Sequence, residues 1–167
     1  MDASLAWIAL LRAVNVGGTG KLAMEDFAAC CRSAGFNEVR TFIQSGNAVF
    51  RSAQSEDAIR SALARELERL TGRPFGVFIR SGAELARLVA QNPFPGEDPA
   101  KIAVAFLPGP PESSAFNAPG GEQIRPGERA LYVYYPDGMG RSKLKLPTLC
   151  TVRNMNTIAK LAAMAAG

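Results

Sequence analysis

Histidine is absent from the 167 residues of this chain. Without an imidazole, Ser-His and Cys-His nucleophile pairs are excluded, and so are the usual zinc sites with histidine ligands. Among the fifteen carboxylates we find no Asp/Glu pair that suggests a division into acid and base, or a metal cage. The composition therefore favours binding chemistry over hydrolytic or metal-dependent catalysis.

Long apolar runs are also lacking. The run "LAWIALL" at residues 5–11 is far shorter than the roughly 20 residues that a membrane-spanning helix needs, and Asp2 stands where a signal peptide carries positive charge. The three cysteines, Cys30, Cys31 and Cys150, show no disulfide framework. We therefore expect a cytoplasmic protein that does not associate with membranes, with Cys31 as a buried free thiol on a helical face.

Acidic side chains are missing from the C-terminal end of the chain. Residues 138–167 contain five basic side chains and no acidic one, whereas residues 1–137 contain 14 basic and 15 acidic side chains. This end therefore carries a charge of +5, against −1 for the rest. The asymmetry suggests an anionic partner, although a solvated terminal helix would show the same count.

The first 80 residues predict a ferredoxin-like βαββαβ unit. The apolar run at 5–11 is typical of a buried central strand, and apolar residues recur at helical spacing from Met24. Two short strands then flank a turn at Ser45, a second helix begins at about Ser55, and "PFGVFIR" supplies the fourth strand. This order is that of the split βαβ plait, with helices on one face of an antiparallel sheet.

Residues 81–167 predict a second α+β, plait-like unit with a basic C-terminal loop and helix. We expect a helix over 82–91, a strand in "KIAVAFL", a short helix after "GPP", and a hairpin that turns at "PGE" (126–128). A terminal helix is expected from about Asn154. The fold class is therefore α+β, with two ferredoxin-like (alpha-beta plait) units whose antiparallel sheets carry helices on one face.

The glycine-rich loop "NVGGTGKL" (15–22) suggests a phosphate-binding loop, because it joins a predicted strand to a predicted helix. It fails the nucleotide triphosphatase template, since Asn15 replaces the first glycine and Leu22 replaces the hydroxyl residue. It also matches Gly-x-Gly-x-x-Ala from Gly18, but the following strand forms a hairpin instead of a parallel crossover. An anion-binding loop and a loop that only needs glycine conformations remain equal alternatives.

The stretch "FIQSGNAVF" (42–50) lies on the predicted hairpin, where Gln44 and Asn47 flank an ordinary Ser-Gly turn. In a split βαβ unit the first two strands run in the same direction, so the first strand and this hairpin turn end at the same edge. We therefore expect Arg12, Asn15, Gln44 and Asn47 to share a site at that edge. A plain hairpin turn is the alternative.

Two further polar stretches lie near the C-terminus. "PDGMGRSKLK" contains Arg141, Ser142 and Lys143, residue types that hold phosphate or carboxylate, and a solvated basic turn is the alternative. "TVRNMNT" places Arg153 beside the expected start of the last helix, a favourable position for an anion. The alternative is that Asn154 or Thr151 simply caps that helix. Tyr132 and Tyr134 in the hairpin are candidates for stacking on bases.

Four ordered stretches carry a family resemblance: "ALLRAVNVGG", "FIQSGNAVF", "GRSKL" and "RNMNT". The chain resembles the bacterial family called domain of unknown function 1697 over essentially its whole length. The resemblance implies two ferredoxin-like units and a cytoplasmic bacterial protein, and it implies no activity. Ala13 and the short link "KLPTLC" depart from the family pattern.

We therefore expect a protein that binds an anionic, phosphate-bearing small molecule or nucleic acid. A metal-independent, histidine-free enzyme for a phosphorylated or carboxylated substrate is one alternative, and a structural or interaction module without a ligand is another. We assign no catalytic residue, metal or cofactor, and leave the oligomeric state open. The predicted ligand-binding residues are Arg12, Asn15, Gly17, Gly18, Lys21, Gln44, Ser45, Asn47, Arg141, Ser142, Lys143, Arg153, Asn154 and Asn156.

Overall fold

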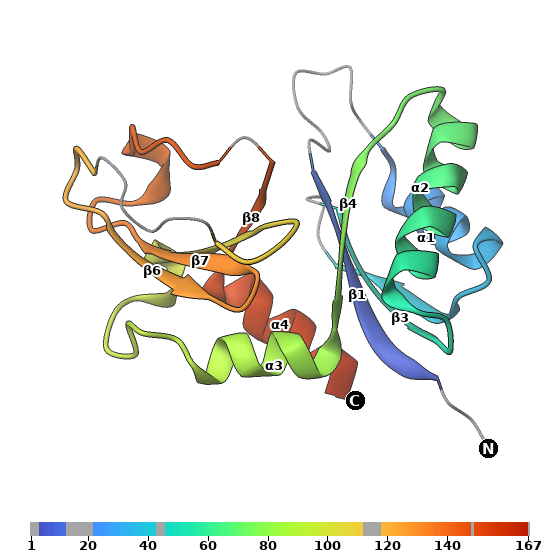
Figure 1. Cartoon of the computed structure of the whole chain (residues 1–167), viewed down its shortest axis with the longest axis horizontal. Helices are drawn as coiled ribbons and strands as arrows, with labels where there is room; N and C mark the ends of the chain where they lie inside the picture. The colour runs from blue at the N-terminus through green and yellow to red at the C-terminus, as the bar shows by residue number, and fades with distance from the viewer. Residues whose placement is uncertain (1–3, 13–21, 43–45, 112–117, 148, 167) are drawn as a thin grey trace. The chain divides into compact units, whose positions relative to one another are not determined.

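The chain folds into two compact units around two sheets. The computed structural model describes residues 4–12, 22–42, 46–111, 118–147 and 149–166, and the side chain of Arg141 lies outside this description. One unit comprises Met1–Gly82 with Ala163–Gly167, and the other comprises Ala83–Ala162. Each contains a four-stranded antiparallel sheet (Figure 1). The predicted α+β class with two ferredoxin-like units is confirmed.

The first unit has the predicted βαββαβ order. Its elements are β1 (Leu5–Arg12), α1 (Met24–Ser33), β2 (Asn37–Thr41), β3 (Asn47–Ser52), α2 (Glu56–Thr71) and β4 (Gly76–Ser81). The strands lie in the order β2-β3-β1-β4, and α1 and α2 lie together on one face of the sheet (Figure 1). This is the strand order of a split βαβ plait.

Local sequence determines both ends of α2. The Ser55 hydroxyl accepts a hydrogen bond from the Ala58 N–H at 3.2 Å and thereby caps the first turn. Gly72 ends the helix with φ 78°, a left-handed conformation that glycine adopts without strain. Between these ends the buried face repeats at helical spacing through Ile59, Leu63 and Leu67.

The helices close the core of the first unit over one face of the sheet. Phe36 and Phe50 stack there with ring centroids 4.2 Å apart. Cys31 is 0% exposed, and burial raises its pKa to about 12, so its thiol stays protonated at neutral pH. The predicted burial of Cys31 is therefore confirmed.

The last turn of α4 (Met155–Ala166) completes the first unit. Arg40 donates from Nη2 to the Met164 carbonyl oxygen at 2.6 Å, which places a cation at the negative end of the helix. A Cβ on Gly82 would lie 2.9 Å from the Cβ of Ala165. Glycine is therefore required at position 82 for the helix end to approach so closely.

The second unit has the same strand order in its sheet, β6-β7-β5-β8. Its elements are α3 (Gly82–Ala90), η1 (Pro99–Lys101), β5 (Ile102–Phe106), β6 (Gln123–Gly127), β7 (Ala130–Tyr134), η2 (Met139–Arg141), β8 (Thr151–Asn154) and most of α4. Two predictions need correction. The hairpin turns at Glu128 and Arg129, because Gly127 already pairs with Ala130.

The second correction concerns the segment before the last helix, for which no strand was predicted. Residues 151–154 form a strand that pairs with β5, and the helix begins at Met155, close to its expected start at about Asn154. The β-branched pair Thr151 and Val152 favours this extended conformation. The short helix expected after "GPP" falls on residues 112–117, outside the described residues.

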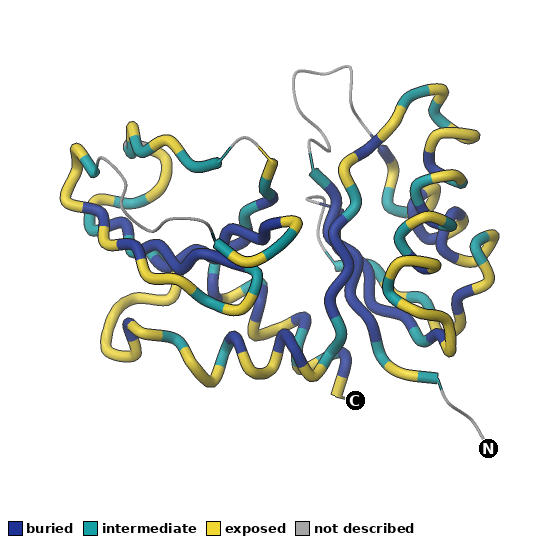
Figure 2. The backbone as a smooth tube through the Cα atoms, in the orientation of Figure 1, coloured by how far each residue is buried: buried dark blue, intermediate teal, exposed yellow. Residues whose placement is uncertain are grey.

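The two crossover segments of the second unit differ from those of the first. Residues 107–122 and 135–150 connect the same pairs of strands that α1 and α2 connect in the first unit, yet their described parts contain only the 3₁₀ turn η2. Figure 2 shows the described residues of these crossovers as mostly intermediate or exposed. In the second crossover, Leu144 and Leu146 pack on the sheet while Lys143 and Lys145 are exposed. This alternation has the period of a strand.

Candidate functional site

The end of β1 and the β2–β3 turn lie at the same edge of the first sheet. β1 and β2 are both antiparallel to β3, Leu10 pairs with Asn47, and the Leu11 N–H donates to the Gly46 carbonyl at 2.9 Å. The shared edge predicted from the topology is therefore confirmed. The predicted site residues Asn15, Gly17, Gly18, Lys21, Gln44 and Ser45 lie outside the described residues, and their binding role remains a prediction.

Asn47 serves the turn itself. Its side chain donates from Nδ2 to the Phe42 carbonyl at 3.0 Å, and the Phe42 N–H donates back to the Asn47 carbonyl at 3.0 Å. Asn47 is 0% exposed, so no solvent-accessible surface of this residue faces a ligand. Arg12 lies half-buried beside Gly76, where a Cβ would approach the Arg12 Cβ to 3.1 Å.

A hollow of 410 Å³ lies in the second unit, at the sheet edge where β5 and β6 begin and β7 ends. The two crossover segments supply most of its wall, and Lys101 precedes β5. Its lining residues are Lys101, Pro119, Gly120, Glu122, Pro136, Asp137, Gly138, Ser142 and Lys143. Ser142 and Lys143 of the predicted basic loop are therefore part of a real concavity.

Glu122 joins the two crossover segments. It is 8% exposed, its Oε1 accepts from the Gly120 N–H at 3.0 Å, and its Oε2 accepts from the Ser142 hydroxyl at 2.8 Å. Burial raises the pKa of this carboxyl, but the hydrogen bonds from Ser142, Gly120 and its own N–H outweigh burial, so the pKa lies below its usual value. Glu122 is therefore ionised at neutral pH.

The Ser142 hydroxyl fixes the basic loop and leaves no proton for a ligand. It donates to Glu122 and accepts from the Leu144 N–H at 3.1 Å. Among the described lining residues, the side chains with further donor hydrogens are Lys101 and Lys143. Lys101 donates from Nζ to the Pro136 carbonyl at 3.1 Å and, as an ammonium, has two more hydrogens, while Lys143 is exposed.

The predicted residues of β8 and α4 do not line this hollow. Arg153 is 7% exposed and donates from Nη1 to the Thr151 hydroxyl at 2.7 Å. Burial lowers the pKa of Arg153 to about 10, so it remains a cation at neutral pH. Asn154 accepts from the Thr157 N–H at 2.9 Å and is the cap of α4, and Asn156 is exposed on the helix.

The hairpin tyrosines have separate surroundings. Tyr132 is 2% exposed and donates its hydroxyl to the Leu88 carbonyl at 2.6 Å, so it belongs to the core. Tyr134 is half-buried and lies against Phe94, with ring centroids 5.7 Å apart. Only Tyr134 therefore keeps part of its ring accessible for stacking.

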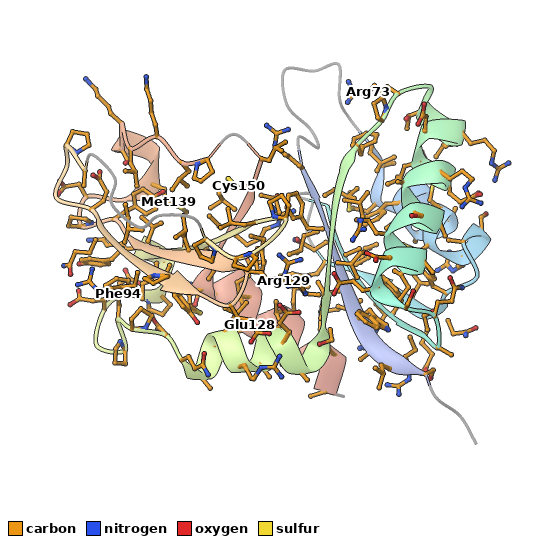
Figure 3. All side chains as sticks on the ribbon, in the orientation of Figure 1. Arg73, Phe94, Glu128, Arg129, Met139 and Cys150 are labelled. Carbon is orange, nitrogen blue, oxygen red and sulfur yellow. The ribbon has the colours of Figure 1, made fainter. Side chains whose placement is uncertain are left out.

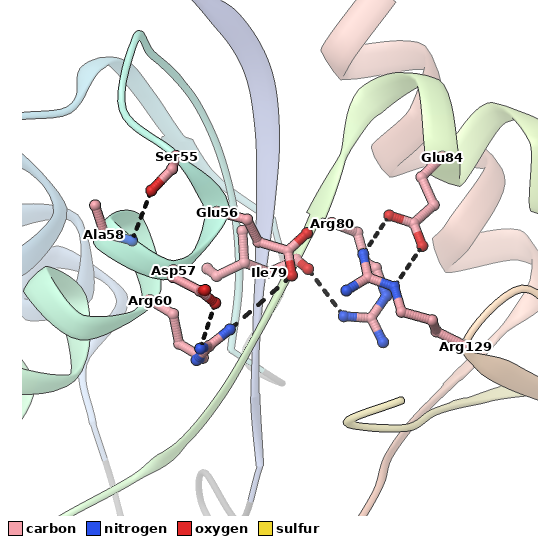
Figure 4. A network of polar contacts seen from close by, with 9 residues as sticks. All are labelled: Ser55, Glu56, Asp57, Ala58, Arg60, Ile79, Arg80, Glu84 and Arg129. Carbon is pink, nitrogen blue, oxygen red and sulfur yellow. Dashed lines mark hydrogen bonds and ion pairs between the residues drawn. The ribbon is translucent and has the colours of Figure 1, made fainter. Parts of the chain in front are cut away.

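At the opposite end of the second sheet, ion pairs close the hairpin turn. Arg129 donates to Glu84 from Nη2 at 2.6 Å and from Nε at 3.0 Å (Figure 4). The neighbouring Glu128 accepts from Arg87 at 2.9 and 3.1 Å. Figure 3 shows both turn residues beside α3, which supplies the two partners one helical turn apart. Two ion pairs of opposite polarity, Arg129 with Glu84 and Glu128 with Arg87, thus hold this turn against α3.

Sequence reasoning missed Glu122 and Lys101 as wall residues. Glu122 lies 20 positions from Ser142, and Lys101 lies 35 positions from the carbonyl that its Nζ contacts. No local motif signals such distant contacts. The sequence held one indirect indication: "GGEQ" precedes the first strand of the predicted hairpin and the basic loop follows its second strand, so both segments are expected at the open end of that hairpin.

The described parts of the chain provide no group of three or more Cys, Asp or Glu side chains placed to hold a metal ion. Nor does any helix in those parts have the length and apolar character required to cross a bilayer.

Comparison with known proteins identifies a family whose description names no function. The family model described as "Protein of unknown function (DUF1697)" matches residues 5–132. A solved structure, that of the conserved bacterial protein SP0830 from Streptococcus pneumoniae, is similar with a TM-score of 0.72 and 20% sequence identity, over 98% of this chain and 99% of that one. No curated protein matches. At this identity the structural similarity shows the fold alone.

Proposed function

The chain belongs to the DUF1697 family, and from the geometry of its second unit we propose that it binds a small anionic molecule, such as a phosphate-bearing metabolite. The hollow between the crossover segments is the proposed site. The observation that carries this proposal is that Lys101 and Lys143, from distant parts of the sequence, line one concavity. Ammonium groups hold phosphate and carboxylate through charge-assisted hydrogen bonds.

The size of the hollow favours a small molecule over a nucleic acid. Its 410 Å³ falls in the range of about 300–1,000 Å³ that is typical of small-molecule sites. A nucleic acid would instead engage exposed cations along a surface, and would use Lys145 as well as Lys143. Lys145 is exposed but does not line the hollow. Comparing the effects of removing Lys143 and Lys145 therefore distinguishes a small-molecule ligand from a nucleic acid.

The groups at the site are better suited to binding than to catalysis. A general base works best with a pKa near the working pH, and the pKa of Glu122 is shifted the other way. The Ser142 hydroxyl donates to this weakly basic carboxylate and is not activated as a nucleophile. Lys101 and Lys143 can hold and orient an anion without further chemistry.

Calorimetric titration of the whole chain with inorganic phosphate, at low and at physiological salt, tests the proposal. We expect Lys143→Ala to weaken binding about fivefold, the upper end for one exposed charge pair. Lys145→Ala, the matched control two residues away, should change it less than about twofold. No binding to the unaltered protein, or equal losses in both variants, would contradict a site in the hollow.

A single-stranded oligonucleotide serves as the competing probe. If the basic loop binds nucleic acid, both lysine variants should weaken oligonucleotide binding and the affinity should fall steeply with salt. We expect no such binding. Recovery of a phosphate-bearing small molecule from the purified protein by native mass spectrometry would support the proposal directly.

A further inference from the structure

The wall of the hollow carries charges of both signs. It contains two ammonium groups, on Lys101 and Lys143, and two carboxylates, on Glu122 and Asp137. The formal charge of these four side chains is therefore zero. A site built only for an anion would be expected to exclude carboxylates, because a carboxylate repels an anion and lowers its affinity.

The two carboxylates are not equivalent. Both oxygens of Glu122 accept hydrogen bonds from the protein, from Gly120 and Ser142, and its side chain is buried. Asp137 is exposed and lies beside Gly138 in the wall. The Glu122 carboxylate therefore holds the basic loop through Ser142, whereas the Asp137 side chain is exposed to solvent and accessible to a ligand.

Asp137 and Lys143 lie on the same crossover segment, six positions apart and separated by the turn η2. Both line the hollow, so a molecule that occupies it lies beside both residues. An anionic group at Lys143 and Lys101 leaves the Asp137 carboxylate within the same concavity for a cationic group. A carboxylate accepts hydrogen bonds from an ammonium in the same charge-assisted manner.

Resting on the proposed anion site, we propose that its ligand is a small zwitterion with an anionic group and an amino group a few bonds apart. Lys143 and Lys101 bind the anionic group, and Asp137 binds the amino group. Phosphorylated amino alcohols and amino acids with a second anionic group have this chemistry. The mixed wall then provides selectivity, because a plain anion of the same size meets Asp137 without a compensating charge.

Two probes of matched shape test this inference in calorimetric titrations. O-Phosphoethanolamine carries an ammonium where propyl phosphate carries a methyl group. We expect the unaltered protein to prefer O-phosphoethanolamine about threefold, the effect of one solvent-exposed ion pair. Asp137→Asn should abolish this preference, whereas Glu97→Gln, which removes the same charge from a residue that does not line the hollow, should retain it.

The outcomes separate this inference from the proposed function. Equal binding of both probes by the unaltered protein, or a preference that survives Asp137→Asn, overturns the zwitterionic ligand. The anion site itself stands in either case if Lys143→Ala still weakens both probes. Failure of both probes and of inorganic phosphate to bind overturns the two proposals together. Circular dichroism of each variant establishes that it is folded.

Discussion

The two units arrange four strands in the same order but cover and connect them differently. In the first unit both crossovers are helices, and α2 alone contributes three fully buried side chains to the core. In the second unit the described parts of the crossovers contain no α-helix, and Leu144 and Leu146 pack on the sheet. The second sheet therefore has the same strand order although no α-helix occurs in the described parts of its crossovers.

The difference also determines where polar groups gather. Crossovers without an α-helix leave backbone and side chains that cannot all bond locally, and the hollow of the second unit is lined mainly by the described parts of its crossovers. The crossovers of the first unit include α1 and α2, which cover a face of its sheet (Figure 1). At the other end of the second sheet, the hairpin turn is closed by ion pairs to α3. Ion pairs thus close the turn at one end of that sheet, and the hollow lies at the other end.

Removing core side chains from the two kinds of cover should give the largest contrast. Leu63→Ala in α2, at a 0% exposed position, should lower the free energy of unfolding of the first unit by about 4 kcal/mol. Leu144→Ala, at a half-buried position, should cost about 1 kcal/mol in the second unit because its site is already partly hydrated.

The chain has built-in probes for this comparison. Its one tryptophan, Trp7, lies in the first core, and all three tyrosines lie in the second unit. Urea unfolding followed by tryptophan fluorescence and by tyrosine ring NMR signals reports the units separately. Equal losses of unfolding free energy in Leu63→Ala and Leu144→Ala would show that the crossover containing Leu144 stabilises its sheet as much as α2 stabilises the first sheet.

The buried ion pair of the second unit should give the next largest effect. Glu84→Gln leaves Arg129 without its carboxylate at a 4% exposed position, and we expect a loss of about 3 kcal/mol in the tyrosine-detected transition. Arg87→Gln breaks the neighbouring exposed pair and should cost less than about 1 kcal/mol. Similar losses of stability in Glu84→Gln and Arg87→Gln would contradict the expectation that the buried ion pair stabilises this turn more than the exposed one.

Caps should contribute equally in the two units. Ser55→Ala removes the cap of α2 and Asn154→Ala removes the cap of α4, and each should cost about 1 kcal/mol of stability. Phosphate titration should show unchanged affinity for Asn154→Ala. Weaker phosphate binding in Asn154→Ala, with stability unaffected, would support the original prediction that Asn154 binds the ligand.

The smallest effect concerns acid stability of the second unit. Because the folded-state pKa of Glu122 lies below its ordinary value of 4.5, its hydrogen bonds stabilise the fold above about pH 4.5. That stabilisation is lost as the pH falls through the folded-state pKa. The temperature of thermal unfolding between about pH 6 and pH 3 should therefore depend less on pH in Glu122→Gln than in the unaltered protein. An identical pH dependence would argue against a stabilising role of the hydrogen bonds that Glu122 accepts from Ser142 and Gly120.

Local patterns were sufficient to predict the first unit. Helical spacing on α2, the glycine at its end and the continuous apolar run of β1 are all signals within a few residues, and topology then placed the hairpin turn beside the end of β1. In the second unit the same reasoning placed the last helix from about Asn154, close to its observed start, but predicted no strand over Thr151–Asn154. That segment is a strand because it pairs with β5, about 50 positions earlier in the sequence.

The candidate site could be predicted only in part. The composition of "GRSKLK" pointed to Ser142 and Lys143, both of which line the hollow. It could not show that Ser142 already donates to Glu122, or that Lys101 lies in the same wall, because these are contacts between distant segments. Asn47 shows the same limit, since its burial and its bond to Phe42 depend on the folded hairpin.

The contact of Arg40 with Met164 has a consequence for synthesis on the ribosome. The first unit includes Ala163–Gly167, which are translated only after all of residues 83–162. A nascent chain that has just exposed its first 82 residues therefore lacks the helix end that meets Arg40 and Gly82. The contacts of Arg40 and Gly82 with the end of α4 can therefore form only after the C-terminal half of the chain has been synthesised.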